Sequence, residues 1–135
     1  MPGTPEIRRI LIVDDERTIA DTLAIIFTTR GYEARVAYSA ESAIETIAVW
    51  QPDSAVVDVM LPFMNGIDFS IVLKENYPAC NVILFSGQPD TSKLLEEALK
   101  KGHSFEILAK PLHPTTILDK IESLFETPAP PMADA

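Results

Sequence analysis

The chain has 135 residues, 47% of them hydrophobic and 23% charged, which is the composition of a single globular domain. Its 11 Lys and Arg residues against 20 Asp and Glu residues give a formal net charge of −9, which argues against binding to nucleic acid or to an anionic membrane. No apolar run suits a transmembrane helix or a secretory signal, and the single cysteine, Cys80, cannot form an internal disulfide, so we expect a cytoplasmic protein.

Prolines cluster at both ends of the chain and predict extended tails there. We expect an N-terminal tail over residues 1–5, one folded unit over residues 6–126 and a proline-rich C-terminal tail over residues 127–135. Within the folded unit, short apolar runs alternate with segments of helical period. The continuous β-branched run at residues 10–13 is typical of a strand buried on both faces.

The remaining elements follow in order. A helix that ends at Gly31 precedes a strand at residues 33–37, and Ser39 is the expected N-cap of the next helix, which Pro52 closes. Strands are then predicted at residues 54–58, 81–85 and 105–109, with helices at residues 67–76 and 91–101 and a last helix ending near residue 126.

Five strand–helix units in this order predict an α/β fold with a parallel sheet and helices on both faces. Right-handed crossovers leave few strand orders. In one of them, 2-1-3-4-5, a crevice lies beyond the carboxyl ends of strands one and three.

Polar residues follow several of these strands. Strand ends are often polar, but the particular mixture here favours a chemical site. Crowded carboxylates repel one another unless a cation binds, and Mg²⁺ prefers oxygen ligands. A carboxylate can attack a phosphoryl group, and a hydroxyl and an ammonium can stabilise the charge on its oxygens. The residues concerned are Asp14, Asp15 and Glu16 after the first strand, Asp58 ending the third, Ser86 after the fourth and Lys110 after the fifth.

The chain resembles the receiver domain of two-component response regulators, also described as CheY-like. The matching pieces are ILIVDDE at residues 10–16, VVDVMLPFMNG at 56–66, LFSG at 84–87 and LAKP at 108–111. They span most of the folded unit. The resemblance implies the flavodoxin-like strand order 2-1-3-4-5 and a switch, in the form of a single-domain response regulator, that is controlled by phosphorylation.

The resemblance also implies roles for the acidic residues. Asp58 is then the phospho-acceptor, which takes its phosphoryl group from a phosphohistidine. Asp15 is the direct Mg²⁺ ligand, Asp14 holds the metal through water, and the backbone carbonyl of Met60 completes the metal site together with Asp58.

Ser86 and Lys110 are implied to contact the phosphoryl group, and Ser86 to move with it as part of the switch. The family usually has an aromatic switch residue where this chain has Ile107. Phe105, two residues earlier and on the same face of the strand, is the alternative candidate.

We expect the partners to be a sensor histidine kinase or phosphotransfer protein and an unknown downstream protein, with no nucleic acid or membrane. The family resemblance also implies that a homodimer would form through the fourth helix, fifth strand and fifth helix. No enzymatic output domain is expected besides self-phosphorylation and dephosphorylation. The chain is either a stand-alone regulator or a piece of a longer one.

Three other classes fit less well. A small-molecule aspartyl-phosphate phosphatase would need a second Asp where Glu16 stands. A pseudo-receiver that binds partners without phosphate usually lacks one of the site residues, and a flavin-binding protein would need a phosphate loop after strand one. The side chains of Met60 and Met64 are expected to pack within their loop, and Trp50 at a helix end.

Overall fold

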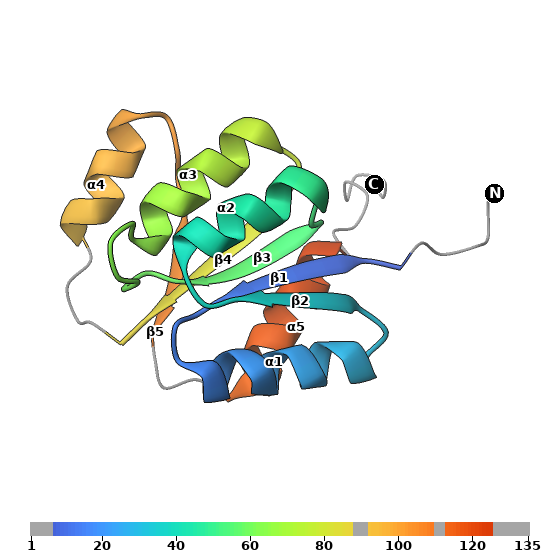
Figure 1. Ribbon diagram of the computed structural model, residues 1–135. Helices are drawn as coiled ribbons and strands as arrows, with labels where there is room; N and C mark the ends of the chain where they lie inside the picture. Colours follow the sequence, from blue (N-terminus) through green and yellow to red (C-terminus); the bar gives the residue numbers. More distant parts are fainter. Residues whose placement is uncertain (1–6, 88–91, 110–112, 126–135) are drawn as a thin grey trace, which may run out of the picture.

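A computed structural model describes residues 7–87, 92–109 and 113–125 of the chain. Strands and helices alternate along it (Figure 1). The strands are β1 (Arg9–Val13), β2 (Glu33–Ala37), β3 (Ser54–Asp58), β4 (Asn81–Ser86) and β5 (Glu106–Ala109). The helices are α1 (Arg17–Thr29), α2 (Ala40–Val49), α3 (Gly66–Asn76), α4 (Ser92–Lys100) and α5 (Pro114–Phe125). The predicted tails, residues 1–5 and 127–135, lie outside the described residues.

The five strands form one parallel sheet in the order β2-β1-β3-β4-β5. Helices α1 and α5 cover one face of the sheet, and α2, α3 and α4 cover the other (Figure 1). The predicted α/β fold, with its 2-1-3-4-5 order and helices on both faces, is therefore confirmed. Because β1 and β3 are neighbours in this order, the loops that follow them leave the same edge of the sheet side by side.

The central strands separate two apolar cores. Ile10 and Ile12 of β1 pack in the core beneath α1 and α5, whereas Leu11 and Val13 pack in the core beneath α2 and α3. All residues of β3 are buried. Alternate side chains thus face opposite layers, which explains why these strands read as continuous apolar runs.

The ends of α1 and α2 follow local sequence signals. Gly31 has φ +93°, a conformation that glycine adopts without strain, and the chain leaves α1 there as predicted. Oγ of Ser39 accepts the backbone N–H of Ser42 at 3.0 Å, which confirms the expected N-cap of α2. At the other end of α2, Trp50 is only 3% exposed, as expected for packing at a helix end.

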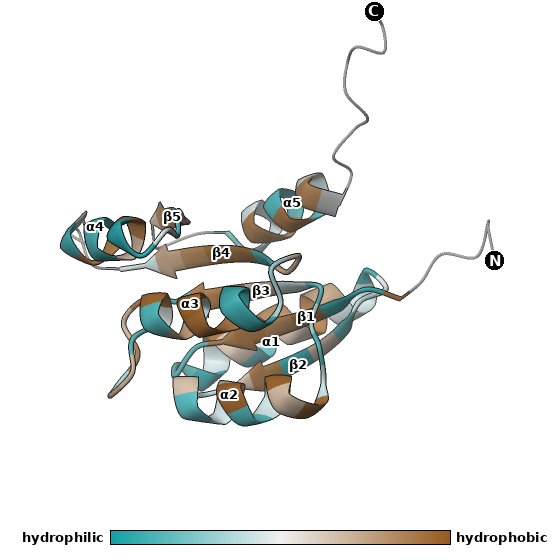
Figure 2. Ribbon diagram, turned by 90° about the horizontal axis from the view of Figure 1, so that it is seen from above, coloured by the Kyte–Doolittle hydropathy of each residue, from teal (hydrophilic) through white to brown (hydrophobic). Residues whose placement is uncertain are grey.

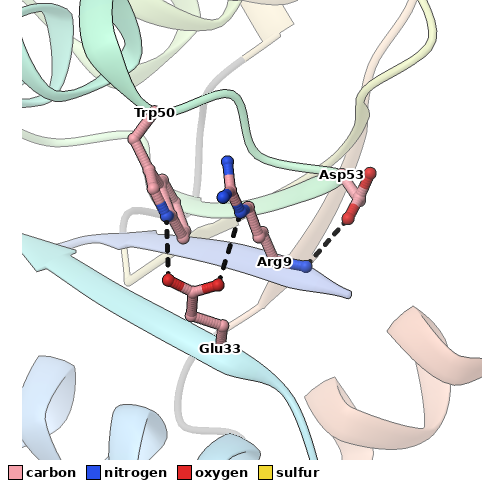
Figure 3. A network of polar contacts seen from close by, with 4 residues as sticks. All are labelled: Arg9, Glu33, Trp50 and Asp53. Atoms are coloured by element: carbon pink, nitrogen blue, oxygen red, sulfur yellow. Dashed lines mark hydrogen bonds and ion pairs between the residues drawn. The ribbon is translucent and has the colours of Figure 1, made fainter. Parts of the chain in front are cut away.

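A network of polar contacts connects neighbouring segments at the amino edge of the sheet (Figure 3). The indole N–H of Trp50 donates to Oε2 of Glu33 at 3.2 Å, and Nε of Arg9 contacts Oε1 of the same carboxylate at 3.4 Å. The backbone N–H of Arg9 donates to Oδ2 of Asp53 at 2.8 Å. These contacts join β1, β2 and the segment before β3 at the amino edge of the sheet. The polar residues that end the strands lie at the opposite, carboxyl edge.

The helices carry both hydrophilic and hydrophobic residues (Figure 2), as helices that pack one side on a sheet do. In the described part of the chain, no helix combines the length and the apolar character needed to cross a membrane.

Candidate functional site

Three buried polar residues lie at the carboxyl edge of the sheet, on neighbouring strands. Asp14 directly follows β1 and is fully buried, Asp58 ends β3 and is 4% exposed, and Ser86 ends β4 and is 2% exposed. The register pairs Val13 with Val57, so the residues that follow, Asp14 and Asp58, lie side by side across the two central strands. The structure therefore brings together residues that are 44 positions apart in the sequence, as the predicted strand order requires.

The acidic group at this edge contains Glu16 in addition to Asp14 and Asp58. Carboxylate oxygens of these three residues all lie within 4.8 Å of one another. Asp15 is exposed and is not a member of this group among the described residues. The reason is the turn after β1, in which the backbone N–H of Glu16 donates to Oδ1 of Asp14 at 2.9 Å. The family resemblance implied that Asp15 is the direct metal ligand. Glu16 was counted among the crowded carboxylates after the first strand but was not included in the expected set of metal ligands.

The acidic group fits a hard divalent cation. Like charges this close are unfavourable unless a proton or a cation neutralises them. The donors are oxygen atoms, which suit Mg²⁺. The chemistry of the donor set is thus compatible with the predicted metal.

The carboxylate of Asp58 is oriented by the loop that follows it. The backbone N–H of Met60 donates to Oδ1 of Asp58 at 3.1 Å. The next residue after Asp58, Val59, donates its N–H to the carbonyl of Phe85 at 2.9 Å, which extends the pairing of β3 with β4 beyond Asp58. The acceptor candidate is therefore held by backbone on the side of its own loop.

The loop between β3 and α3 starts directly after Asp58, and its far end at Gly66 returns to lie against the backbone of Asp58. The N–H groups of Leu61 and Gly66 both donate to the carbonyl of Val59, at 3.1 and 2.8 Å. A methyl group added at Gly66 would overlap the carbonyl oxygen of Asp58 and would lie 2.8 Å from its carbonyl carbon. Only glycine allows this close approach, and the approach sets the position of the whole loop relative to the acidic group.

One side chain of this loop does not pack as expected, and a second, for which there was no expectation, is almost fully exposed. Met64 packs against the core beneath α2 and α3, but the Met60 side chain is 47% exposed, so the expectation that it packs within the loop was wrong. Phe63 is 97% exposed and has φ 67°, a left-handed conformation that costs a non-glycine residue about 1 kcal/mol. Sequence reasoning gave Phe63 no role, since a turn-rich loop does not reveal which residue takes the positive φ.

The candidate switch residues lie on and beside β5. Phe105 directly precedes β5, Ile107 lies within it, and both pack against the core beneath α2 and α3, so their expected common face is confirmed. The ring of His103 stacks on Phe105 with centroids 6.1 Å apart, and its Nε2 lies 3.6 Å from Oε2 of Glu75 on α3. Ser86 pairs in register with Ala109, the last residue of β5.

Lys110, the expected phosphate-binding lysine, lies outside the described residues.

Arg17, the first residue of α1, packs on an aromatic ring that follows β2. The guanidinium carbon of Arg17 lies 4.0 Å from the centroid of the Tyr38 ring. The Tyr38 hydroxyl donates to Oδ1 of Asp21 at 2.6 Å, and this hydrogen bond raises the pKa of Tyr38 above its ordinary value. Arg17 thus packs on Tyr38 and Tyr38 is tied to α1, which fixes the start of α1 beside the site.

Comparison with known proteins gives one consistent family. The profile of the response regulator receiver domain matches residues 10–122. The DNA-binding response regulator MtrA of Mycobacterium tuberculosis is 28% identical over 116 residues, which cover 86% of this chain and 50% of MtrA. The nitrogen assimilation regulatory protein NtrX of Azorhizobium caulinodans is 30% identical over 120 residues, which cover 87% of this chain and 26% of NtrX. The chain thus spans half or less of the length of these curated relatives.

Solved structures show the same fold. A CheY-like response regulator receiver domain from Methanospirillum hungatei JF-1 superposes with a TM-score of 0.80 at 27% identity, covering 90% of this chain and 96% of that one. The signal receiver domain of an HD domain-containing protein from Pseudomonas fluorescens Pf-5 gives a TM-score of 0.80 at 26% identity, covering 90% and 97%.

Proposed function

Since the chain belongs to the family of response regulator receiver domains, we propose that it is a signalling switch in which Asp58 accepts a phosphoryl group from a phosphohistidine. The donor is a sensor histidine kinase or a phosphotransfer protein, and the switch works in the cytoplasm. The observation that carries this proposal is the placement of Asp58 at the carboxyl end of β3, buried and within 4.8 Å of the carboxylates of Asp14 and Glu16.

In the proposed step, a carboxylate oxygen of Asp58 attacks phosphorus in line with the donor nitrogen. The N–P bond breaks as the O–P bond forms, and the imidazole nitrogen keeps the electron pair. Water later attacks the acyl phosphate, which restores the Asp58 carboxylate and releases inorganic phosphate. The hydrogen bond from the Met60 N–H to Oδ1 of Asp58 supports this role, because it fixes the carboxylate plane before the donor arrives.

We propose that Mg²⁺ is held by Asp14, Asp15, Asp58 and the backbone carbonyl of Met60. The close approach of the Asp14 and Asp58 carboxylates supports this set, and Glu16 adds a further negative charge beside it. When bound, the metal would neutralise charge on the carboxylates and on the phosphoryl oxygens. The residues themselves hold the acceptor in a buried position where bulk water is largely excluded.

Ser86 and Lys110 complete the proposed site by contacting phosphoryl oxygens. The position of Ser86 at the end of β4, the strand next to β3, supports its part. Movement of Ser86 toward the phosphoryl group would be transmitted to β5, with which it is paired, and to Phe105 or Ile107. The output surface is then the α4-β5-α5 side, for a downstream protein or a second copy of the chain.

The proposal does not include nucleic acid binding by the receiver fold itself. MtrA is named as DNA-binding, but the matched segment covers only 50% of it. The net charge of −9 supports a protein partner rather than a polyanion.

Phosphorylation by a small donor tests the proposal without knowledge of the partner. The protein is incubated with acetyl phosphate and Mg²⁺, and its intact mass is recorded beside Asp58→Asn and beside a sample with a chelator. We expect one phosphoryl group on the wild type with Mg²⁺ and none on either control. A wild type that binds Mg²⁺ yet gains no phosphoryl group, from this donor or from a cognate kinase, would instead indicate a pseudo-receiver.

A further inference from the structure

The most exposed large hydrophobic side chain in the described part of the chain is Phe63, at 97%. It lies in the middle of the loop between β3 and α3, which in Figure 2 projects beyond the end of α3. Both ends of this loop are fixed beside Asp58, because the N–H groups of Leu61 and Gly66 donate to the carbonyl of Val59. Phe63 therefore lies on a short projecting loop whose base is next to the acceptor.

Neither folding nor packing accounts for a phenylalanine at this position. Its φ of 67° is reached more easily by glycine or asparagine, so the residue strains the backbone. A ring that is 97% exposed gains almost nothing from the core. An exposed aromatic on a strained backbone at the edge of a reactive site is a feature that binding, rather than stability, explains.

Met60 is a second exposed apolar residue of this loop and lies next to the acceptor. Its side chain is 47% exposed, and its N–H is bonded to Oδ1 of Asp58. A donor must bring phosphorus into contact with the nearly buried Asp58 carboxylate, so the body of a donor domain comes close to the loops that leave this edge of the sheet, and the loop that directly follows Asp58 is one of them. The acidic group of Asp14, Glu16 and Asp58 gives the body of a donor domain no apolar contact, whereas the exposed side chains of this loop offer one.

We propose that Phe63 and Met60 form the apolar contact for the domain that presents phosphohistidine to Asp58, and that Phe63 determines which donor domains are accepted. This inference rests on the proposed function, because it assumes that Asp58 is phosphorylated. It assigns Phe63 to recognition of the donor protein and not to the transfer chemistry.

Comparing protein donors with small donors tests the assignment. Phe63→Asn removes the ring and still adopts the positive φ, Phe63→Tyr keeps an aromatic ring, and Val49→Asn is the control. Val49 is 83% exposed and ends α2, so it lies at the opposite edge of the sheet. The donors are acetyl phosphate, phosphoramidate and the autophosphorylated cytoplasmic portions of the histidine kinases encoded in the same genome.

We expect Phe63→Asn to lower kcat/KM for the fastest kinase by about tenfold, as loss of a central aromatic contact typically does. Rates with both small donors should stay unchanged, and the variant should melt no lower than the wild type. Phe63→Tyr and Val49→Asn should behave as the wild type with every donor.

The inference would be overturned if Phe63→Asn accepted phosphate from the kinase as fast as the wild type does. It would also be overturned if the phosphorylation rate fell equally with the kinase and with the small donors, or if no kinase phosphorylated the wild type faster than phosphoramidate does. If instead neither small donor nor kinase modifies Asp58 in the wild type, the proposed function itself fails.

Discussion

The backbone N–H of Glu16 donates a hydrogen bond of 2.9 Å to Oδ1 of Asp14 and so closes the turn that follows β1. The turn brings the Glu16 carboxylate to within 4.8 Å of those of Asp14 and Asp58, whereas Asp15 is exposed. Glu16 therefore adds a negative charge to the acidic group although it lies beyond the end of β1. Its effect should be visible in metal binding.

Replacing Glu16 by Gln should weaken Mg²⁺ binding by about threefold to tenfold at low ionic strength, because one negative charge near the metal is removed in a partly exposed setting. Isothermal titration calorimetry at low and high salt measures this directly. Glu45→Gln is the matched control, since Glu45 is exposed on α2. Equal affinities in the two variants would show that Glu16 does not act on the metal.

Mg²⁺ should stabilise the fold by relieving repulsion among the carboxylates. At a free concentration ten times the dissociation constant, binding to the native state alone adds about 1.4 kcal/mol, which corresponds to a few degrees in melting temperature. The fluorescence of Trp50, the only tryptophan in the chain, follows the melt. NaCl at matched ionic strength is the control.

Asp14→Asn should melt at a higher temperature than the wild type when Mg²⁺ is absent. Adding Mg²⁺ should raise its melting temperature less than it raises that of the wild type. The amide oxygen can still accept the Glu16 N–H, so the turn after β1 is kept while one buried charge is lost. A metal-free Asp14→Asn protein that melts below the wild type would contradict the view that charge repulsion dominates this edge.

Gly66→Ala should destabilise the domain by about 2–4 kcal/mol, because the added methyl group meets backbone that cannot rotate away. Its neighbours would be the carbonyl group of Asp58 and, at 2.9 Å, Cγ1 of Val57. Gly31→Ala is the informative comparison. Gly31 has φ +93° but nothing within 4 Å, so that change should cost only about 1 kcal/mol of backbone strain.

Urea unfolding of both glycine variants gives the two values. If Gly66→Ala costs no more than Gly31→Ala, the loop between β3 and α3 is free to move away from Asp58, and the tight connection between them is not as described.

Cys80 should be an unreactive thiol in the folded protein, and its burial should lower the free energy of unfolding at high pH. Burial raises its pKa from 9.0 to about 12. Between those two values the unfolded chain has lost the thiol proton and the folded protein has kept it, so the free energy of unfolding should fall as the pH rises from 9 toward 12. Below pH 9 the thiol is protonated in both states and adds no pH dependence.

The measurement is the unfolding free energy of the wild type and of Cys80→Ala against pH. The difference between them should decrease above pH 9 and stay constant below it, and the native thiol should react with iodoacetamide at pH 8 only on unfolding. Rapid modification of the folded protein at pH 8 would contradict the assigned burial.

Much of the fold is predictable because single residues determine it locally. The buried run at residues 10–13 predicted β1, and Gly31 and Ser39 predicted where α1 ends and α2 begins. The proximity of Asp14 and Asp58 followed from parallel strands that end at one edge. These inferences rest on the apolar pattern of a strand or on the residues that flank a helix. Both features can be recognised from a few neighbouring residues in the sequence.

The details beyond the strand ends were less predictable. Alternation stops at Val13, so the sequence could not show that Glu16 rather than Asp15 would turn toward Asp58. The positive φ of Phe63 depends on how the Val59 carbonyl closes the loop, which no spacing reveals. The Met60 side chain was expected to pack and is half exposed, although the Met60 backbone is bonded to Asp58.

The central claim is that Asp58, and no other residue, carries the phosphoryl group. After incubation with acetyl phosphate and Mg²⁺, borohydride reduces an aspartyl phosphate to homoserine, and tandem mass spectrometry of the digested protein locates that product. We expect homoserine at position 58 in place of Asp58, and none elsewhere. Homoserine at position 14 or 15, or an unmodified Asp58 in a protein that has gained a phosphoryl group, would contradict the claim.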